Sequence, residues 1–478
     1  MTDITRTPLS GETREEHDLL GYKQVPVEYY FGVQTMRALE NFHISRVRLN
    51  FFPEFIRALA DVKQAAAEAN RELALLEAET ADAIAAACKE VREGRFDAHF
   101  VVDMVQGGAG TSTNMNANEV IANRALELLG HKKGEYKYCH PNNHVNLSQS
   151  TNDAYPTAIK IALVRSIADM VGSLRKLIDA FADKGKEFAH VIKMGRTQLQ
   201  DAVPMTLGQE FDAYAANLSE EIERLEQNYR LLYEMNMGAT AIGTGINADP
   251  DYPAVCEKHL REITDLPMVH ASNMIEATND TGSFVMNSSA LKRLAVKLSK
   301  ICNDLRLMSS GPRCGLNEIN LPPMQPGSSI MPGKVNPVIP EVVNQVAFKV
   351  IGNDLTVTFA AEAGQLELNV MEPIIVHSLF ESIDLLRNAM NTLREKCVEG
   401  ITANEDVCRR MVYNSIGLVT ALNPYLGYET SSDLASTALR TGKGIYDLVL
   451  ERGLMSKDEL DNILRPENMV APRRFPRK

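Results

Sequence analysis

The stretch that decides the fold is FDAYAANLSEEIERLEQNYRLLYEM, residues 211–235. Its apolar side chains recur at steps of three or four residues, at Phe211, Tyr214, Leu218, Ile222, Leu225, Tyr229, Leu232 and Met235. An average step of about 3.4 residues is typical of a seam between long packed helices, which is narrower than the stripe of an ordinary surface helix. The segment from Leu291 to Met308 has the same spacing. We therefore expect a bundle of helices, each roughly 35 Å long or more at about 1.5 Å per residue.

Working outward, most of the remaining chain also has helical periodicity. Long patterns cover residues 157–190, 337–362 and 374–399; a helical pair covers 53–94, a helix covers 116–130, and one or two short strands are expected in 22–33. After Gly400 the patterns are shorter and are interrupted by glycine and proline. The sequence predicts a mainly α fold with an N-terminal domain (1–149), a central long-helix bundle (150–402) and a small C-terminal helical domain (403–478).

Composition excludes several classes of protein. The chain has 478 residues and a net charge of −12, so it lacks the basic face expected for a nucleic-acid or anionic-membrane partner. Its seven cysteines are scattered without a Cys-x-x-Cys pair, a pattern typical of a reducing compartment. No signal-like segment or bilayer-spanning apolar stretch is apparent, and we expect a cytoplasmic protein with no membrane partner.

Two polar segments precede helical patterns in the first third of the chain. QGGAGTSTNMN (106–116) reads either as a capped flexible loop or as a ring of donors aimed at an anion. SQSTNDAYP (148–156) has four capping-type residues where one side chain satisfies only one or two amides. Its surplus hydroxyl and amide groups could bind a carboxylate, and simple capping remains the alternative.

Two more polar segments follow. In GRTQLQDAVP (195–204), Arg196 and Asp201 are expected to pair with each other, while Thr197 and Gln198 are neutral donors that could orient a substrate. GSSIMPGKVNP (327–337) contains prolines and glycines that exclude a regular helix. It fails the phosphate-loop pattern in glycine spacing and in the residue after Lys334. The histidines form no metal-ligand pattern, so no metal and no cofactor are predicted.

The last segment, GSSIMPGKVNP, resembles the signature of the aspartase/fumarase superfamily. GGAGTSTNMNANE (107–119), SQSTNDAYPT (148–157), GRTQLQDAVPMTLGQE (195–210) and GATAIGTGIN (238–247) are also similar to that family. The resemblance covers nearly the whole chain. It implies a homotetramer whose central domains pool their helices, with each active site shared between three subunits, and it implies a small dicarboxylate as substrate.

Within the superfamily, three positions resemble ammonia-eliminating members more than class II fumarases. Thr151 stands where fumarases have serine, Val338-Ile339-Pro340 follows the signature, and Gln198 stands in place of a histidine. The expected reaction is the elimination of ammonia from L-aspartate to give fumarate. Because that histidine is missing, the resemblance assigns neither Gln198 nor Glu341 to a proton relay.

The resemblance also implies roles for individual residues. Ser328 would be the base that removes the C3 proton, through an aci-carboxylate intermediate. The substrate-binding residues would be Thr111, Ser150, Thr151, Asn152, Thr197, Gln198, Ser329, Lys334 and Asn336. Two alternatives stay open: a class II fumarase, and a non-catalytic helical scaffold, for which the intact Ser328, Lys334 and Asn336 have no use.

Overall fold

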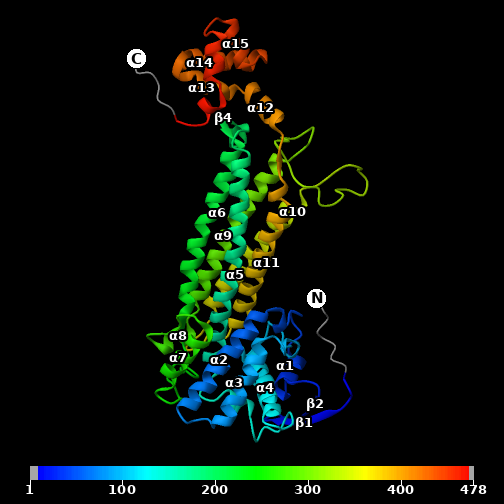
Figure 1. Ribbon diagram of the computed structural model, residues 1–478, viewed down its shortest axis with the longest axis vertical. Helices are drawn as coiled ribbons and strands as arrows, with labels where there is room; N and C mark the ends of the chain where they lie inside the picture. Colours follow the sequence, from blue (N-terminus) through cyan, green and yellow to red (C-terminus); the bar gives the residue numbers. More distant parts are fainter. Residues whose placement is uncertain (1–8, 473–478) are drawn as a thin grey trace. The chain divides into compact units, whose positions relative to one another are not determined.

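The computed structural model describes residues 9–472, and they are mainly helical, as predicted (Figure 1). The five longest helices are α5 (Thr151–Glu187), α6 (Leu207–Tyr229), α9 (Gly282–Met308), α10 (Val338–Glu362) and α11 (Glu372–Lys396). Each covers a segment in which the sequence predicts a helix. The fold class and the positions of the long helices are therefore confirmed.

The stretch 211–235 ends differently from the prediction. Helix α6 stops at Tyr229 and is followed by a 3-10 turn, Arg230–Tyr233, and by strand β5 (Glu234–Met235). This short strand pairs in parallel with β6 (Val269–His270). Leu232 and Met235 are fully buried, so the apolar spacing continues although the helix does not. Spacing reports which side chains are buried, and several backbone conformations can bury them.

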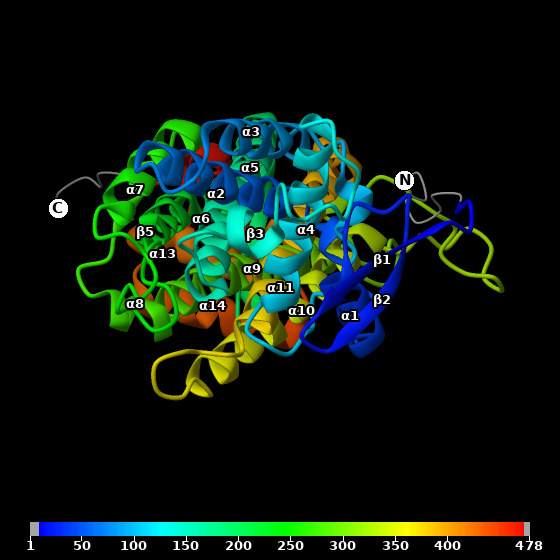
Figure 2. The ribbon, with the colours of Figure 1, turned by 90° about the horizontal axis from the view of Figure 1, so that it is seen from below.

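The chain divides into two compact units. The first combines the residues up to Val171 with Glu223–Arg293 and Lys349–Leu386. This unit includes segments of the long helices and the short strands β5 and β6. Its other helices and strands are β1 (Thr13–Asp18), β2 (Gly21–Pro26), α1 (Val33–Asn41), α2 (Pro53–Glu72), α3 (Ala78–Arg92), α4 (Thr111–Leu128), α7 (Tyr252–Thr264) and α8 (Met274–Asn279). The antiparallel hairpin β1–β2 contacts α1 (Figures 1 and 2). The strand predicted in 22–33 is thus present, and its partner lies earlier in the chain.

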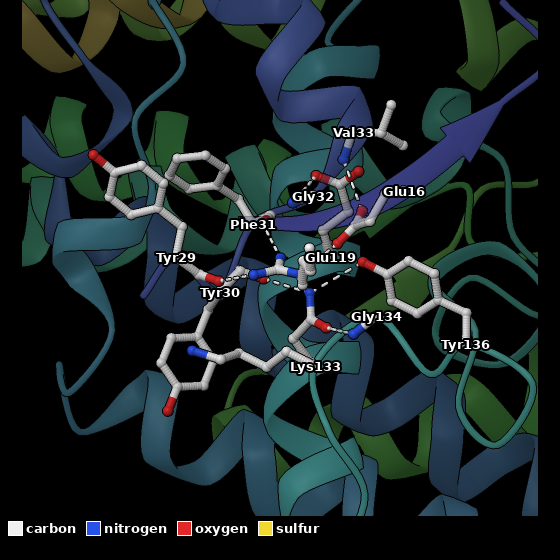
Figure 3. A network of polar contacts seen from close by, with 12 residues as sticks. Glu16, Tyr29, Tyr30, Phe31, Gly32, Val33, Glu119, Lys133, Gly134 and Tyr136 are labelled. Carbon is white, nitrogen blue, oxygen red and sulfur yellow. Dashed lines mark hydrogen bonds and ion pairs between the residues drawn. The ribbon is translucent and has the colours of Figure 1, made fainter. Parts of the chain in front are cut away.

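Two buried carboxylates hold the beginning of α1 (Figure 3). Glu119 on α4 accepts hydrogen bonds from the Gly32 amide at 2.7 Å and the Thr35 hydroxyl at 2.7 Å, and Glu16 on β1 accepts from the Val33 amide at 2.9 Å. Burial raises the pKa of Glu119 to about 7. The first amides of a helix have no partner within the helix, and these side chains supply one.

The second unit combines Gly172–Ile222, Leu294–Phe348 and the residues from Arg387 onward. Its strands β3 (Ile192–Thr197) and β4 (Gln200–Thr206) form an antiparallel hairpin. Strand β7 (Ile319–Asn320) pairs with β8 (Thr402–Ala403). The C-terminal helices are α12 (Glu405–Asn414), α13 (Val419–Leu426), α14 (Tyr428–Thr441), α15 (Ile445–Glu451), α16 (Lys457–Ile463) and α17 (Pro466–Met469).

One apolar core joins these C-terminal helices to the hairpin. Ile192 and Met194 of β3 are buried in the same cluster as Val412, Leu434 and Leu460. The base of the hairpin is therefore fixed in that core, whereas the residues of its turn, 197–199, are exposed. Within residues 9–472, no helix is both long and apolar enough to cross a membrane.

Candidate active site

The glycine-rich segment is a tight turn that starts α4. Gly108, Ala109 and Gly110 all have positive φ, at 93°, 53° and 89°. A side chain at Gly110 would lie 2.5 Å from the ring of Tyr155, so only glycine fits there. The helix begins at Thr111, so the prediction that the irregular segment extends to Asn116 was wrong. Thr111 is exposed in the first turn, where its hydroxyl donates to the Gly108 carbonyl at 2.7 Å.

The serine- and threonine-rich segment caps α5. The Asn152 amide donates to the Ser150 hydroxyl at 3.2 Å, and the Asp153 carboxylate accepts from the Ser150 amide at 2.9 Å, in the manner of a capping box. Thr151 is the first helical residue. Ser150, Thr151 and Asn152 are each half-buried, and Asp153 is fully buried. Capping is therefore real, but it uses only part of the polar content of this segment.

A buried lysine lies under both segments. Lys63 of α2 donates to Asn114 at 2.6 Å, Asn146 at 2.9 Å and Gln149 at 2.8 Å. Asn114, one turn after Thr111, donates in turn to the Thr151 hydroxyl at 3.0 Å. Burial lowers the pKa of Lys63 to about 7. The first turns of α4 and α5 are thus joined through Asn114 and Thr151. Thr111 lies at the positive end of one helix, and Ser150, Thr151 and Asn152 lie at the positive end of the other.

Thr197 and Gln198 lie at the tip of the β3–β4 hairpin. Gln198 and Leu199 form its two-residue turn, with φ of 55° and 61°, the geometry that matches strand twist but is unfavourable for side chains other than glycine, asparagine and aspartate. Thr197, Gln198 and Leu199 are all exposed. The sequence predicts donors here but not the hairpin that presents them.

The predicted ion pair between Arg196 and Asp201 is wrong. The two residues are opposite each other across the hairpin, yet Arg196 donates to Glu318 at 2.9 Å, and Asp201 accepts from Ser415 at 2.7 Å. Glu318 is fully buried and also lies 3.6 Å from the ammonium of Lys193. A buried carboxylate attracts a cation more strongly than an exposed carboxylate does, and Arg196 therefore pairs with Glu318 and not with Asp201.

Residues 327–337 form a closed loop with no regular helix, as predicted. The Gly327 amide donates to the Lys334 carbonyl at 2.8 Å, and the Asn336 side-chain amide donates to the Gly327 carbonyl at 2.8 Å. Within this ring the Ser328 hydroxyl accepts from the amides of Ile330 and Met331, at 3.2 and 3.1 Å. Two amides aimed at one hydroxyl oxygen would stabilise that oxygen when it carries negative charge.

The other predicted members of this loop differ in exposure. Ser329 and Lys334 are exposed, whereas Asn336 is half-buried and its amide group is occupied by the loop itself. Lys334 therefore has its ammonium at the surface of the loop, where an anion could reach it. The side-chain amide nitrogen of Asn336 closes the loop, and only its side-chain oxygen remains available for another contact.

Two groups of predicted site residues are thus assembled, each within its own unit. The first unit gathers Thr111, Ser150, Thr151 and Asn152; the second holds the Ser328 loop and the Thr197 turn. The buried supports Lys63, Asp153 and Glu318 were not predicted as functional. Lys63 had one detectable signal, because it is a charged residue within the alanine-rich run ADVKQAAAEAN of α2.

Comparisons with known proteins identify the family of this chain. A family model described as "Lyase" matches residues 21–352, and one described as "Fumarase C C-terminus" matches residues 418–471. The chain belongs to the aspartase/fumarase superfamily of lyases.

Similar proteins narrow the assignment within that superfamily. An aspartate ammonia-lyase from Pseudomonas canavaninivorans is 62% identical, over 97% of this chain and 98% of its own length. A crystal structure titled fumarate lyase:delta crystallin, from Brucella melitensis, is 54% identical with a TM-score of 0.94 and covers 96% of this chain and 100% of its own. A class II fumarase from Schistosoma mansoni has 36% identity and a TM-score of 0.91, covering 97% and 100%. This superfamily member is an aspartate ammonia-lyase by close similarity, and hence a carbon–nitrogen lyase.

Proposed function

We propose that this chain catalyses the reversible elimination of ammonia from L-aspartate to give fumarate, with Ser328 as the base that removes the C3 proton. The observation that carries the proposal is the pair of backbone amides, from Ile330 and Met331, that donate to the Ser328 hydroxyl oxygen. An ordinary serine is far too weakly acidic to act as a base near neutral pH. Donors already aimed at its oxygen would favour the alkoxide without reorganisation during the reaction.

Proton removal from C3 builds negative charge on the neighbouring carboxylate and leads to an aci-carboxylate. The barrier therefore depends on preorganised donors around that carboxylate. Ser150 and Thr151, with Thr111 on the adjoining helix end, supply hydroxyl groups next to two positive helix ends. Ser329 would add a hydroxyl from the Ser328 loop.

The remaining residues would hold the rest of the substrate. Lys334 and Asn336 would bind the second carboxylate, with Lys334 supplying the charge. Asn152 and Gln198, with Thr111, would orient the amino group, and Thr197 would complete the pocket. The amine in its ammonium form leaves as NH₃ without gaining a proton, and neither Gln198 nor Glu341 is assigned a role in proton transfer.

The complete site would be composite, shared between three subunits of a homotetramer. A support for assembly is the apolar surface of α10, where five large side chains are exposed by between 38% and 65%: Val342, Phe348, Ile351, Leu355 and Phe359. Rows of exposed apolar residues of this kind on one helix mark protein–protein interfaces. We retain the three-domain division 1–149, 150–402 and 403–478 as part of this proposal. All seven cysteines are free, which suits the proposed cytoplasmic location.

The experiment that tests the function follows the absorbance of the fumarate double bond with purified protein. L-aspartate should give fumarate and L-malate should give little or none. Malate turnover comparable to aspartate turnover would favour the second candidate, a class II fumarase, which has 36% identity to this chain in one solved example. No turnover of either would leave the scaffold alternative.

A further inference from the structure

The side-chain amide of Asn152 has a fixed orientation. Its Nδ2 donates to the backbone carbonyl of Ala241 at 2.7 Å. A carbonyl oxygen only accepts hydrogen bonds, so it takes the NH₂ end of the amide. The opposite end, the Oδ1 acceptor, is then the end available to a ligand.

The partner segment around Ala241 is itself held by Asp153. The fully buried carboxylate of Asp153 accepts from the amides of Gly238 at 3.2 Å and Thr240 at 2.9 Å, on the residues just before Ala241. Its other oxygen accepts from the Ser150 amide. One carboxylate therefore ties the end of α5 that carries Asn152 to the segment that orients its side chain.

Two further features restrict this segment to one conformation. Gly243 has a φ of 95°, and a side chain there would lie 2.4 Å from the backbone of Ile275. Asn236, also fully buried, donates to the Asn152 carbonyl at 3.0 Å and to the Thr278 hydroxyl at 3.1 Å. The Ala241 carbonyl thus has little freedom to leave Asn152.

The chemistry of the substrate gives this arrangement a meaning. An ammonium group has only donors and needs an acceptor, whereas the hydroxyl of a hydroxy acid can donate or accept. An asparagine free to flip would serve both groups. An asparagine held with its oxygen outward always offers the acceptor that an ammonium group requires, whereas one turned to present its NH₂ group would place donors against donors.

We propose that Asp153 is a positioning residue for recognition of the amino group: it holds segment 236–245 so that the Ala241 carbonyl keeps the Asn152 side-chain oxygen directed at the substrate amine. This inference rests on the proposed function, in which Asn152 binds that amine. The new element is that Asp153 and the segment 236–245 determine which end of the Asn152 side-chain amide faces the substrate.

The test uses the full-length enzyme in the reverse direction, where ammonia and fumarate are separate substrates. Asp153→Asn places an NH₂ group against backbone amides and disturbs the segment. The KM for ammonia should rise about tenfold or more, several times the change in the KM for fumarate and in inhibition by succinate, a dicarboxylate without an amine. A smaller change in these two is expected from the altered contact to the Ser150 amide. Asn236→Ala, a milder change, should give the same separation to a smaller extent and covers the case in which Asp153→Asn does not fold.

The matched control is Glu119→Gln, which also removes a buried carboxylate that accepts from backbone amides, but at the beginning of α1 (Figure 3). It should lower thermal stability without separating the two KM values. The inference would be overturned if both Asp153→Asn and Asn236→Ala changed the KM for ammonia and the KM for fumarate equally, or if neither variant changed either KM. The proposed function would then remain intact. A wild-type enzyme that forms no fumarate from aspartate would instead overturn the proposed function.

Discussion

Glu318→Ala should destabilise the protein strongly, because it removes a carboxylate placed between two cations. The Glu318 side chain is 0% exposed, that of Lys193 is 4% exposed and that of Arg196 is 16% exposed. Removing one partner of a buried ion pair destabilises by about 3–5 kcal/mol, since the remaining charge is left without compensation. Lys193 keeps a second partner in Glu210, so we expect a loss of about 3 kcal/mol, near the lower limit of that range.

Two matched variants separate charge from shape. Glu318→Gln keeps the shape and an acceptor for Arg196 but loses the charge, and should destabilise by about 1.5–3 kcal/mol, the value of a hydrogen bond to a charged group. The double variant Arg196→Met with Glu318→Leu removes the charge together with one of its cations. It should be more stable than Glu318→Ala alone, because replacing a whole buried pair by apolar residues is often nearly neutral.

The assay is urea unfolding followed by circular dichroism, at one fixed protein concentration because subunit assembly shifts apparent stability. We expect wild type to be the most stable, followed by Glu318→Gln and then by Glu318→Ala. The double variant should be more stable than Glu318→Ala. A Glu318→Ala protein within about 1 kcal/mol of wild type, or a double variant no more stable than Glu318→Ala, would refute the reasoning.

Three further predictions concern catalysis, assembly and pH. Ser328→Ala should lower kcat by on the order of 10² to 10⁴ while circular dichroism stays unchanged, and a near wild-type kcat would show that the base lies elsewhere. The inactive variants Ser328→Ala and Asn152→Ala can be unfolded and reassembled together in equal amounts. If each site is shared between chains, about a quarter of the sites should be intact, and activity should approach roughly 25% of wild type. If each site is built within one chain, the mixture should regain no activity. Burial raises the pKa of Glu372 to about 8, above its ordinary value of 4.5, so its contribution to stability is present below about pH 4.5 and is lost as the pH rises through about 8. Relative to wild type, Glu372→Gln should therefore gain at least about 2 °C in Tm between pH 5 and pH 9, and parallel Tm curves would contradict the shift.

The long helices could be predicted because their signal is local and repeated. Each contributes an apolar side chain every three or four residues over several turns, and burial of that seam favours a helix whatever the neighbouring chain does. Helix ends could not be predicted as well. Thr111 begins α4 because three positive-φ residues precede it, and the spacing of the segment carries no trace of that turn.

Polar pairing was harder to predict than helix formation. Arg196 and Asp201 are neighbours across a hairpin, and a sequence-based interpretation can see only that proximity. The partner that Arg196 contacts, Glu318, lies 122 residues away in sequence and is completely buried. Electrostatic attraction grows as the local dielectric falls, so burial decides the pairing, and burial is a property of the folded chain.

The same reasoning explains which of the proposed site residues the sequence could predict. Ser150, Thr151 and Asn152 stand out because more capping-type residues precede a helix than capping requires, whereas the role of Thr111 is implied by the family resemblance. Asp153 belongs to the same run but reads as one more capping residue. In the structure its carboxylate is the only one of these side chains that is fully buried and tied to backbone amides of a distant segment. Residues proposed to contact a ligand can thus be predicted from a surplus of polar groups, whereas residues proposed to orient them are recognised only once the fold has buried their charge.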